Sequence, residues 1–85
     1  MKKVICSVRD EKASAWLTPM FFSAPGAAIR AFSDAVNGET EFAKHPEDYT
    51  LFVVGEWCEQ KGELVGCSPK VLGVGVNFLN SEVQS

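Results

Sequence analysis

Apolar and polar side chains alternate at the start of the chain, which predicts a β-strand over residues 3–9. Residues 15–22 are apolar and aromatic, but Pro19 removes a backbone donor from their middle. We therefore expect an irregular or edge strand there. The faces of the first strand would carry Val4, Cys6 and Val8 on one side and Lys3, Ile5, Ser7 and Arg9 on the other.

Helical spacing of apolar residues begins after Pro25 and continues to Asn37. Pro25 suits the first turn of a helix, and Ser23 before it is expected to cap the free backbone donors. Gly38 is placed to end the helix in a left-handed conformation. The apolar stripe of this helix would consist of Ala28, Ile29, Phe32, Ala35 and Val36.

The C-terminal half predicts a long β-hairpin. Residues 49–58 form the longest strand candidate, and Gly62 can take the positive φ that a tight turn requires. Residues 63–68 would return as the partner strand, which Pro69 would end. Residues 39–48 are expected to be a loop, and residues 71–76 a short edge strand or an extended arm.

This order of elements predicts an α+β fold: a small antiparallel sheet with one helix (about residues 24–37) packed on one face and a long C-terminal hairpin. We expect a single compact domain over residues 1–80 and a frayed tail over residues 81–85. The hairpin face expected to seat the helix carries Leu51, Val53, Gly55 and Trp57.

The other hairpin face is too apolar to be left wholly to water. We expect residues 71–79, a second copy of the chain, or a ligand to cover it. Because a short chain buries little surface by itself, we favour a homodimer or higher oligomer. The residues of that oligomer interface would be Phe52, Val54, Val65 and Cys67.

Composition narrows the function classes. The chain has 85 residues, of which 46% are hydrophobic and 22% charged, so it is neither disordered nor fibrous. No apolar run approaches the length of a membrane span, and the N-terminus does not resemble a secretory signal, so we expect a cytoplasmic protein without membrane contact. The net charge of −3 disfavours binding nucleic acid by charge alone, unless the cations cluster in space.

Candidate chemistry is sparse. If the hairpin turns at residues 60–61, Cys58 faces Glu63 and Cys67 faces Val54, so the two thiols are too far apart for a disulfide. Three reduced thiols are therefore expected, and the cysteine spacing lacks the close pairs of a zinc site. His45 lies in a polar loop, and we interpret it as solvated. Without a nucleophile–base pair we expect no catalytic residue, no metal and no cofactor.

A single-strand-binding surface needs exposed rings for base stacking and cations along the backbone. The best local group combines three cations of strand one and the following loop with the ring of the next segment. These candidate nucleic-acid-binding residues are Lys3, Arg9, Lys12 and Trp16.

Two longer stretches are distinctive together: residues 26–37, which read GAAIRAFSDAVN, and residues 45–56, which begin HPEDYTLF. With residues 4–10, they resemble the small nonstructural protein of gokushovirus-type microviruses, which are single-stranded DNA bacteriophages. The resemblance covers about residues 3–80 and implies a DNA-binding or genome-synthesis accessory protein rather than an enzyme. It carries no established binding motif onto individual residues here.

The resemblance implies action in the cytoplasm of the infected bacterium, on or near the genome. Two hypotheses follow. In the first, the protein binds single-stranded DNA during viral genome synthesis or packaging. In the second, it is an acidic protein-interaction module that regulates a viral or host replication protein without binding DNA, which suits the net charge of −3.

Overall fold

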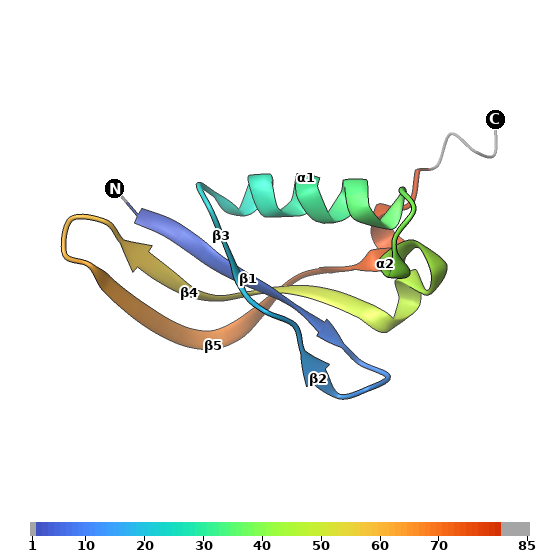
Figure 1. The fold of residues 1–85 in the computed structure, drawn as a ribbon, viewed down its shortest axis with the longest axis horizontal. Helices are drawn as coiled ribbons and strands as arrows, with labels where there is room; N and C mark the ends of the chain where they lie inside the picture. Colours follow the sequence, from blue (N-terminus) through green and yellow to red (C-terminus); the bar gives the residue numbers. More distant parts are fainter. Residues whose placement is uncertain (1, 81–85) are drawn as a thin grey trace.

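The computed structural model describes residues 2–80 and confirms the α+β fold. An antiparallel sheet of five strands, in the order β2-β1-β4-β5 with β3 also paired to β1, carries its helices on one side and at one end (Figure 1). The expected tail over residues 81–85 lies outside the described residues. The elements are β1 (Lys2–Asp10), β2 (Ala15–Trp16), β3 (Met20–Phe22), α1 (Pro25–Val36), α2 (Glu41–Lys44), β4 (Tyr49–Cys58), β5 (Glu63–Val74) and the short 3-10 helices η1 (Pro46–Asp48) and η2 (Gly75–Phe78).

Strand β1 occupies the middle of the sheet, between β4 on one side and the broken pair β2 and β3 on the other. The interruption between β2 and β3 is the expected effect of Pro19, which has no backbone N–H to donate to β1. The chain therefore leaves the hydrogen-bonded pairing with β1 between Trp16 and Met20. Two hydrogen bonds hold this irregular segment on β1: the Leu17 N–H donates to the Val8 carbonyl at 2.8 Å, and the Ser7 hydroxyl donates to the Leu17 carbonyl at 2.6 Å.

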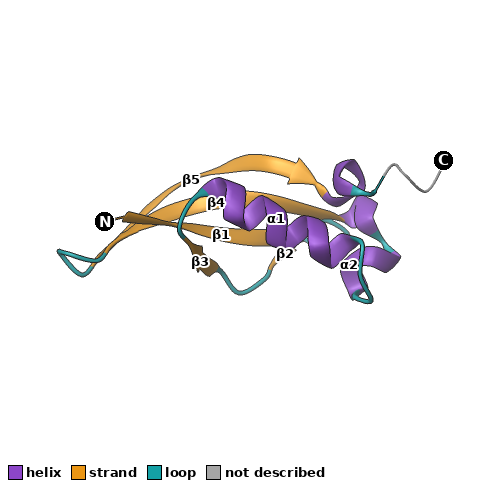
Figure 2. Ribbon diagram, turned by 90° about the horizontal axis from the view of Figure 1, so that it is seen from above, coloured by secondary structure: helices purple, strands orange, loops and turns teal. Residues whose placement is uncertain are grey.

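Helix α1 lies over β1 and β4, as seen from above in Figure 2. Its predicted apolar stripe is confirmed, since Ala28, Phe32 and Val36 are buried against Cys6 and Leu51 of the sheet. The predicted partition of β1 also holds: Val4 and Val8 pack on the same core as Cys6.

The ends of α1 differ from the expectation. Ala24, not Ser23, occupies the N-cap position, and no side chain caps the helix there. At the other end, Gly38 does not adopt positive φ. The amide of Asn37 replaces a left-handed cap, because its Nδ2 donates to the carbonyl oxygens of Ser33 and Phe78, each at 2.8 Å.

The expected loop over residues 39–48 contains the helical turns α2 and η1. Thr40 starts α2, because its hydroxyl oxygen accepts from the Ala43 N–H at 3.2 Å, and its O–H donates to the Ala35 carbonyl at 2.6 Å. The turn also delivers Phe42 to the core, where its ring meets Phe32 edge-on at 5.6 Å and Tyr49 at 4.7 Å. The hydrophobic pattern does not predict this turn, because Phe42 and Ala43 are adjacent and the rest of residues 39–48 gives no helical period.

The β4–β5 hairpin turns at Gly62, which has the predicted positive φ of 67°. The expected register holds from Cys58 opposite Glu63 to Gly55 opposite Gly66. Beyond that point it breaks, and β4 also carries one extra residue opposite β1 around Val54. Such a bulge exchanges the two faces of a strand on either side of it.

Because of the bulge, the prediction of which β4 residues face the helix is partly wrong. Leu51 and Val53 pack toward the core as expected, but Trp57 lies opposite Lys3 in β1, on the other face of the sheet. Gly55 suits the bulge, because a Cβ atom there would lie 2.6 Å from the Val65 carbonyl oxygen of β5.

Strand β5 does not end at Pro69. It passes through an irregular stretch and continues to Val74, pairing Lys70 with Val53 and Val74 with Thr50. As the edge strand of the sheet, β5 tolerates a proline within it. Residues 71–79 thus consist mainly of the end of β5 and of η2, from which Leu72 and Phe78 pack on the core on the helix side. This segment therefore does not cover the opposite sheet face.

All three cysteines are free thiols: Cys6 is buried, Cys58 half-buried and Cys67 exposed. Burial raises the pKa of the Cys6 thiol, so the folded state opposes its ionisation. We expect a disulfide reagent to modify Cys67 first, Cys58 more slowly and Cys6 only on unfolding, with three groups titrated in denaturant. As pH rises past the ordinary thiol pKa, the unfolded chain ionises first and the fold loses stability. Fewer than three thiols in denaturant would contradict this assignment.

Candidate nucleic-acid interface

The sheet face opposite α1, called here the open face, carries most of the exposed aromatic surface. Figure 1 shows the helices above the sheet and at its right-hand end, with no helix of residues 2–80 below it. Opposed residues of an antiparallel pair share a face, so the strand register defines the membership of this surface. The open face carries Lys3, Ile5, Ser7 and Arg9 of β1, Trp16 of β2, Phe21 of β3, Thr50, Phe52 and Trp57 of β4, and Leu64 and Val71 of β5. Ile5, Ser7 and Thr50 among them are buried, so a ligand would meet the residues around them.

One aromatic group on the open face is built around Trp16. Its ring meets Phe52 edge-on, with centroids 4.8 Å apart, and the guanidinium carbon of Arg9 lies 5.3 Å from the Trp16 ring centre. Pairing of Arg9 with Trp16 across β1 and β2 produces this contact. Trp16 remains 42% exposed, so it still offers surface for stacking by a flat ligand.

A second aromatic group lies further along β1, where Phe21 meets Trp57 edge-on with centroids 6.2 Å apart. These two rings, Lys3, Glu59 and Leu64 line a shallow hollow of about 320 Å³. Phe21 is 49% exposed and Leu64 63% exposed. The first group pairs with Arg9 and Ser7 of β1 and the second with Ile5 and Lys3, so the two groups are offset by four residues along the strand, or about 13 Å.

The two cations of the open face, Lys3 and Arg9, each form an ion pair with a carboxylate. Lys3 Nζ lies 3.3 Å from Glu59 Oε2, and Arg9 Nε lies 3.0 Å from Glu11 Oε1. Both pairs are partly exposed, so solvent screens them and they stabilise the fold little. The open face is consequently more aromatic than basic, and a ligand bound there would gain more from stacking than from charge.

The structure brings three of the four predicted nucleic-acid-binding residues to one face: Lys3, Arg9 and Trp16. Lys12 lies in the exposed turn after β1, whose shape is set by the Asp10 carboxylate accepting from the N–H groups of Lys12 and Ala13. Phe21 and Trp57 complete the surface. Neither is among the residues predicted from the sequence, since their meeting depends on β3 and β4 flanking β1.

The four predicted interface residues do not form one patch. Phe52 lies on the open face, whereas Val65 pairs through Glu56 with Val4 on the helix side. Val54 lies at the bulge, and the Cys67 thiol points to the Val53 carbonyl oxygen at 3.9 Å. The expected homodimer or higher oligomer stays a prediction, and the open face is a better surface for it than the original set.

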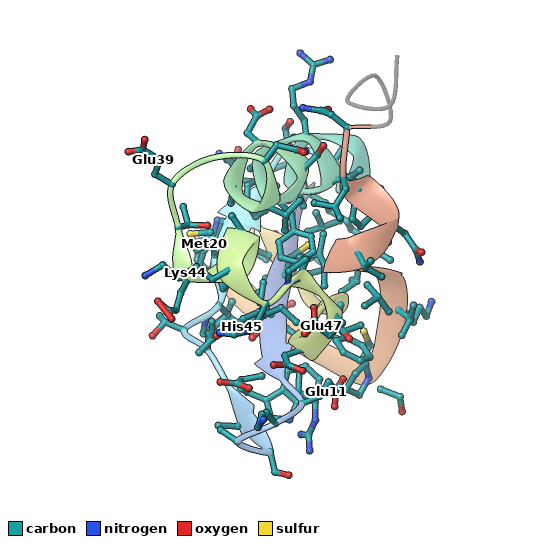
Figure 3. The ribbon with its side chains drawn as sticks, turned by 90° about the vertical axis from the view of Figure 1, so that its right-hand side faces the viewer. Glu11, Met20, Glu39, Lys44, His45 and Glu47 are labelled. Carbon is teal, nitrogen blue, oxygen red and sulfur yellow. The ribbon has the colours of Figure 1, made fainter. Side chains whose placement is uncertain are left out.

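The end of the molecule near α2 is acidic. A side-chain nitrogen of His45 and carboxylate oxygens of Glu47 and Asp48 lie within 4.8 Å of one another in the turn before β4. This turn is at the end of the molecule that faces the viewer in Figure 3. Burial raises the pKa of the neighbouring Tyr49 hydroxyl, and the charges of Asp10, Glu41 and Asp48 raise it further. Such a negative end disfavours contact with phosphates and leaves the open face as the nucleic-acid candidate.

The fold and its surface define a small α+β protein that presents an aromatic sheet face to its surroundings. The chain belongs to the Phage ORF5 protein family, whose model matches residues 3–78, and it is therefore a bacteriophage protein. No curated protein and no solved structure matches it. None of the helices in residues 2–80 has the length and apolar character to cross a membrane.

Proposed function

We propose that this phage protein binds single-stranded DNA on the open face, as an accessory protein of viral genome synthesis or packaging. The supporting observation is the pair of aromatic groups, from β2, β3 and β4, that lie about 13 Å apart along β1, one of them with Arg9 over Trp16. Unpaired bases stack on such rings whatever their sequence, whereas paired bases are hidden inside a duplex. The ligand is therefore a single strand that spans both groups.

The resemblance of the sequence to the nonstructural protein of gokushovirus-type microviruses supports the same proposal, since those phages carry single-stranded genomes. Membership of the Phage ORF5 family agrees with a phage origin. The protein would act in the cytoplasm of the infected bacterium, where the genome is copied, and the chemistry proposed here needs neither a metal nor a cofactor.

Fluorescence anisotropy with a labelled oligonucleotide at two salt concentrations tests the proposal. Each phosphate contact to a single strand contributes about 0.7 to the slope of log K against log salt. Because Lys3 and Arg9 already pair with carboxylates, we expect a shallow slope, between about 0.7 and 2. Changing Lys3, Arg9 and Lys12 together to Gln should bring the slope close to zero.

Arg30→Gln is the matched control, because Arg30 is exposed on α1, away from the open face. It should leave affinity and slope unchanged. If the triple variant kept the parent's slope, the cations that contact phosphate would have to be other residues than these three. A folded parent that binds no oligonucleotide at ~50 mM salt, where phosphate contacts are strong, would rule out the nucleic-acid function.

The second candidate is an acidic interaction module for a viral or host replication protein. The matching of Lys3 by Glu59 and of Arg9 by Glu11 favours it, as does the net charge of −3. Exposed aromatic residues are also common in protein interfaces. Absence of oligonucleotide binding by the folded parent would select this candidate over the first.

A further inference from the structure

The hollow at one end of the open face has a composition that distinguishes it from the other surface depressions. Residues of β1, β3, β4 and β5 line it, together with Glu59 of the β4–β5 turn, and this turn lies at the left-hand end of the sheet in Figure 1. Its apolar side consists of the rings of Phe21 and Trp57, whose planes are 87° apart, together with Leu64. Its polar side is the ion pair of Lys3 and Glu59.

Two other depressions lack this combination. A groove of about 130 Å³ beside α1 is lined by apolar side chains and Thr18, so it offers no charged partner for a polar ligand. A depression near the hairpin turn, lined by Lys2, Glu56, Lys61 and neighbouring residues, contains no ring. The hollow therefore combines rings on which a flat ligand can stack with a charged pair beside them.

The carboxylate of Glu59 restricts which ligand fits. Its Oε2 lies 3.3 Å from Lys3 Nζ, and a carboxylate has further acceptor positions beyond that one contact. An ionised carboxylate only accepts hydrogen bonds and repels phosphate. The group beside it must then be a donor on the flat ligand, while the ligand's phosphate lies on the Lys3 side.

We propose that this hollow binds a base with an exocyclic amine, cytosine being the smallest, and that Glu59 accepts a hydrogen bond from that amine. This inference rests on the proposed binding of single-stranded DNA. Carboxylates accept from N4 of cytosine, whereas thymine presents an oxygen and a methyl group at the same edge. The open face would then bind any single strand by stacking and prefer cytosine over thymine at this one position.

The experiment compares labelled oligo-dC and oligo-dT of equal length at neutral pH and low salt. We expect the parent to bind oligo-dC about five- to tenfold more tightly, the lower range for one side-chain contact to a base edge. Glu59→Gln should reduce this ratio to about one, because an amide both donates and accepts and can pair with either base. Removal of the charge also frees Lys3, so affinity for oligo-dT should rise.

Glu56→Gln is the matched control. Glu56 also pairs with a lysine, Lys2 at 3.8 Å, but it lies opposite Val4 on the helix side of the sheet. The variant removes the same charge and should keep the parent's preference for oligo-dC. Equal binding of both oligonucleotides by the parent, or an unchanged ratio in Glu59→Gln, would overturn the base preference while DNA binding stands. Failure of both oligonucleotides to bind would instead reject the proposed function.

Discussion

Replacing Phe32 with alanine is expected to lower the free energy of unfolding by about 3–5 kcal/mol. Phe32 is 4% exposed, and its ring meets Phe42 at 5.6 Å and Phe78 at 5.7 Å. It thus joins α1 to α2 and η2 on the helix side of the sheet. Because a domain of this size has only a few kcal/mol in reserve, the variant should be largely unfolded near 37 °C.

Urea denaturation followed by tryptophan fluorescence measures this loss. Phe21→Ala is the control of the same chemistry: Phe21 is 49% exposed on the open face, and its removal should cost less than ~1 kcal/mol. Equal destabilisation by the two changes would mean that the aromatic core does not hold the helices on the sheet.

Removing both exposed rings of the open face should nearly abolish oligonucleotide binding. A base stacked on an aromatic side chain contributes about 1–3 kcal/mol, so Trp16→Ala with Phe21→Ala should cost about 2–6 kcal/mol if the two positions are independent. Independence is reasonable because the rings belong to separate groups, one with Phe52 and the other with Trp57. Fluorescence anisotropy at low salt measures the change.

Met20→Ala is the control, because Met20 is 56% exposed next to Phe21 but pairs with Cys6 on the helix side. It should leave oligonucleotide affinity unchanged. Sedimentation of the double variant distinguishes the remaining explanations of the open face. A parent that sediments above 9.3 kDa and a variant that does not would assign the face to a second copy of the chain. Unaltered DNA binding by the variant would remove the face from the nucleic-acid interface.

The local sequence pattern predicts correctly which side chains face the core only where a strand is regular. Val4, Cys6 and Val8 were assigned correctly to the core side of β1, because that strand is regular and side chains alternate with period two. The same rule placed Trp57 beside Leu51 and Val53, which is wrong, since the bulge near Val54 exchanges the faces. No residue near Val54 predicts a bulge from the sequence. Gly55 is compatible with a bulge but also with a regular strand.

The candidate site likewise contains residues that the sequence predicts and residues that only the pairing of strands brings together. Lys3, Arg9 and Trp16 were found from the sequence because they are close along the chain and share a side of one hairpin. Phe21, Trp57 and Glu59 join Lys3 only through the pairing of β3 and β4 with β1. The pairing of Lys3 with Glu59 spans more than fifty residues of sequence and follows from that sheet order.

By itself the sequence determined the α+β class, the apolar stripe of α1, the full extent of β4 and the turn at Gly62. Each of these depends on the period or the conformational freedom of neighbouring residues, which the chain expresses locally. Tertiary structure decided the bulge, the continuation of β5 past Pro69 and the uncovered aromatic face. Those features depend on which strands become neighbours, and contacts between distant segments, not local period, determine that choice.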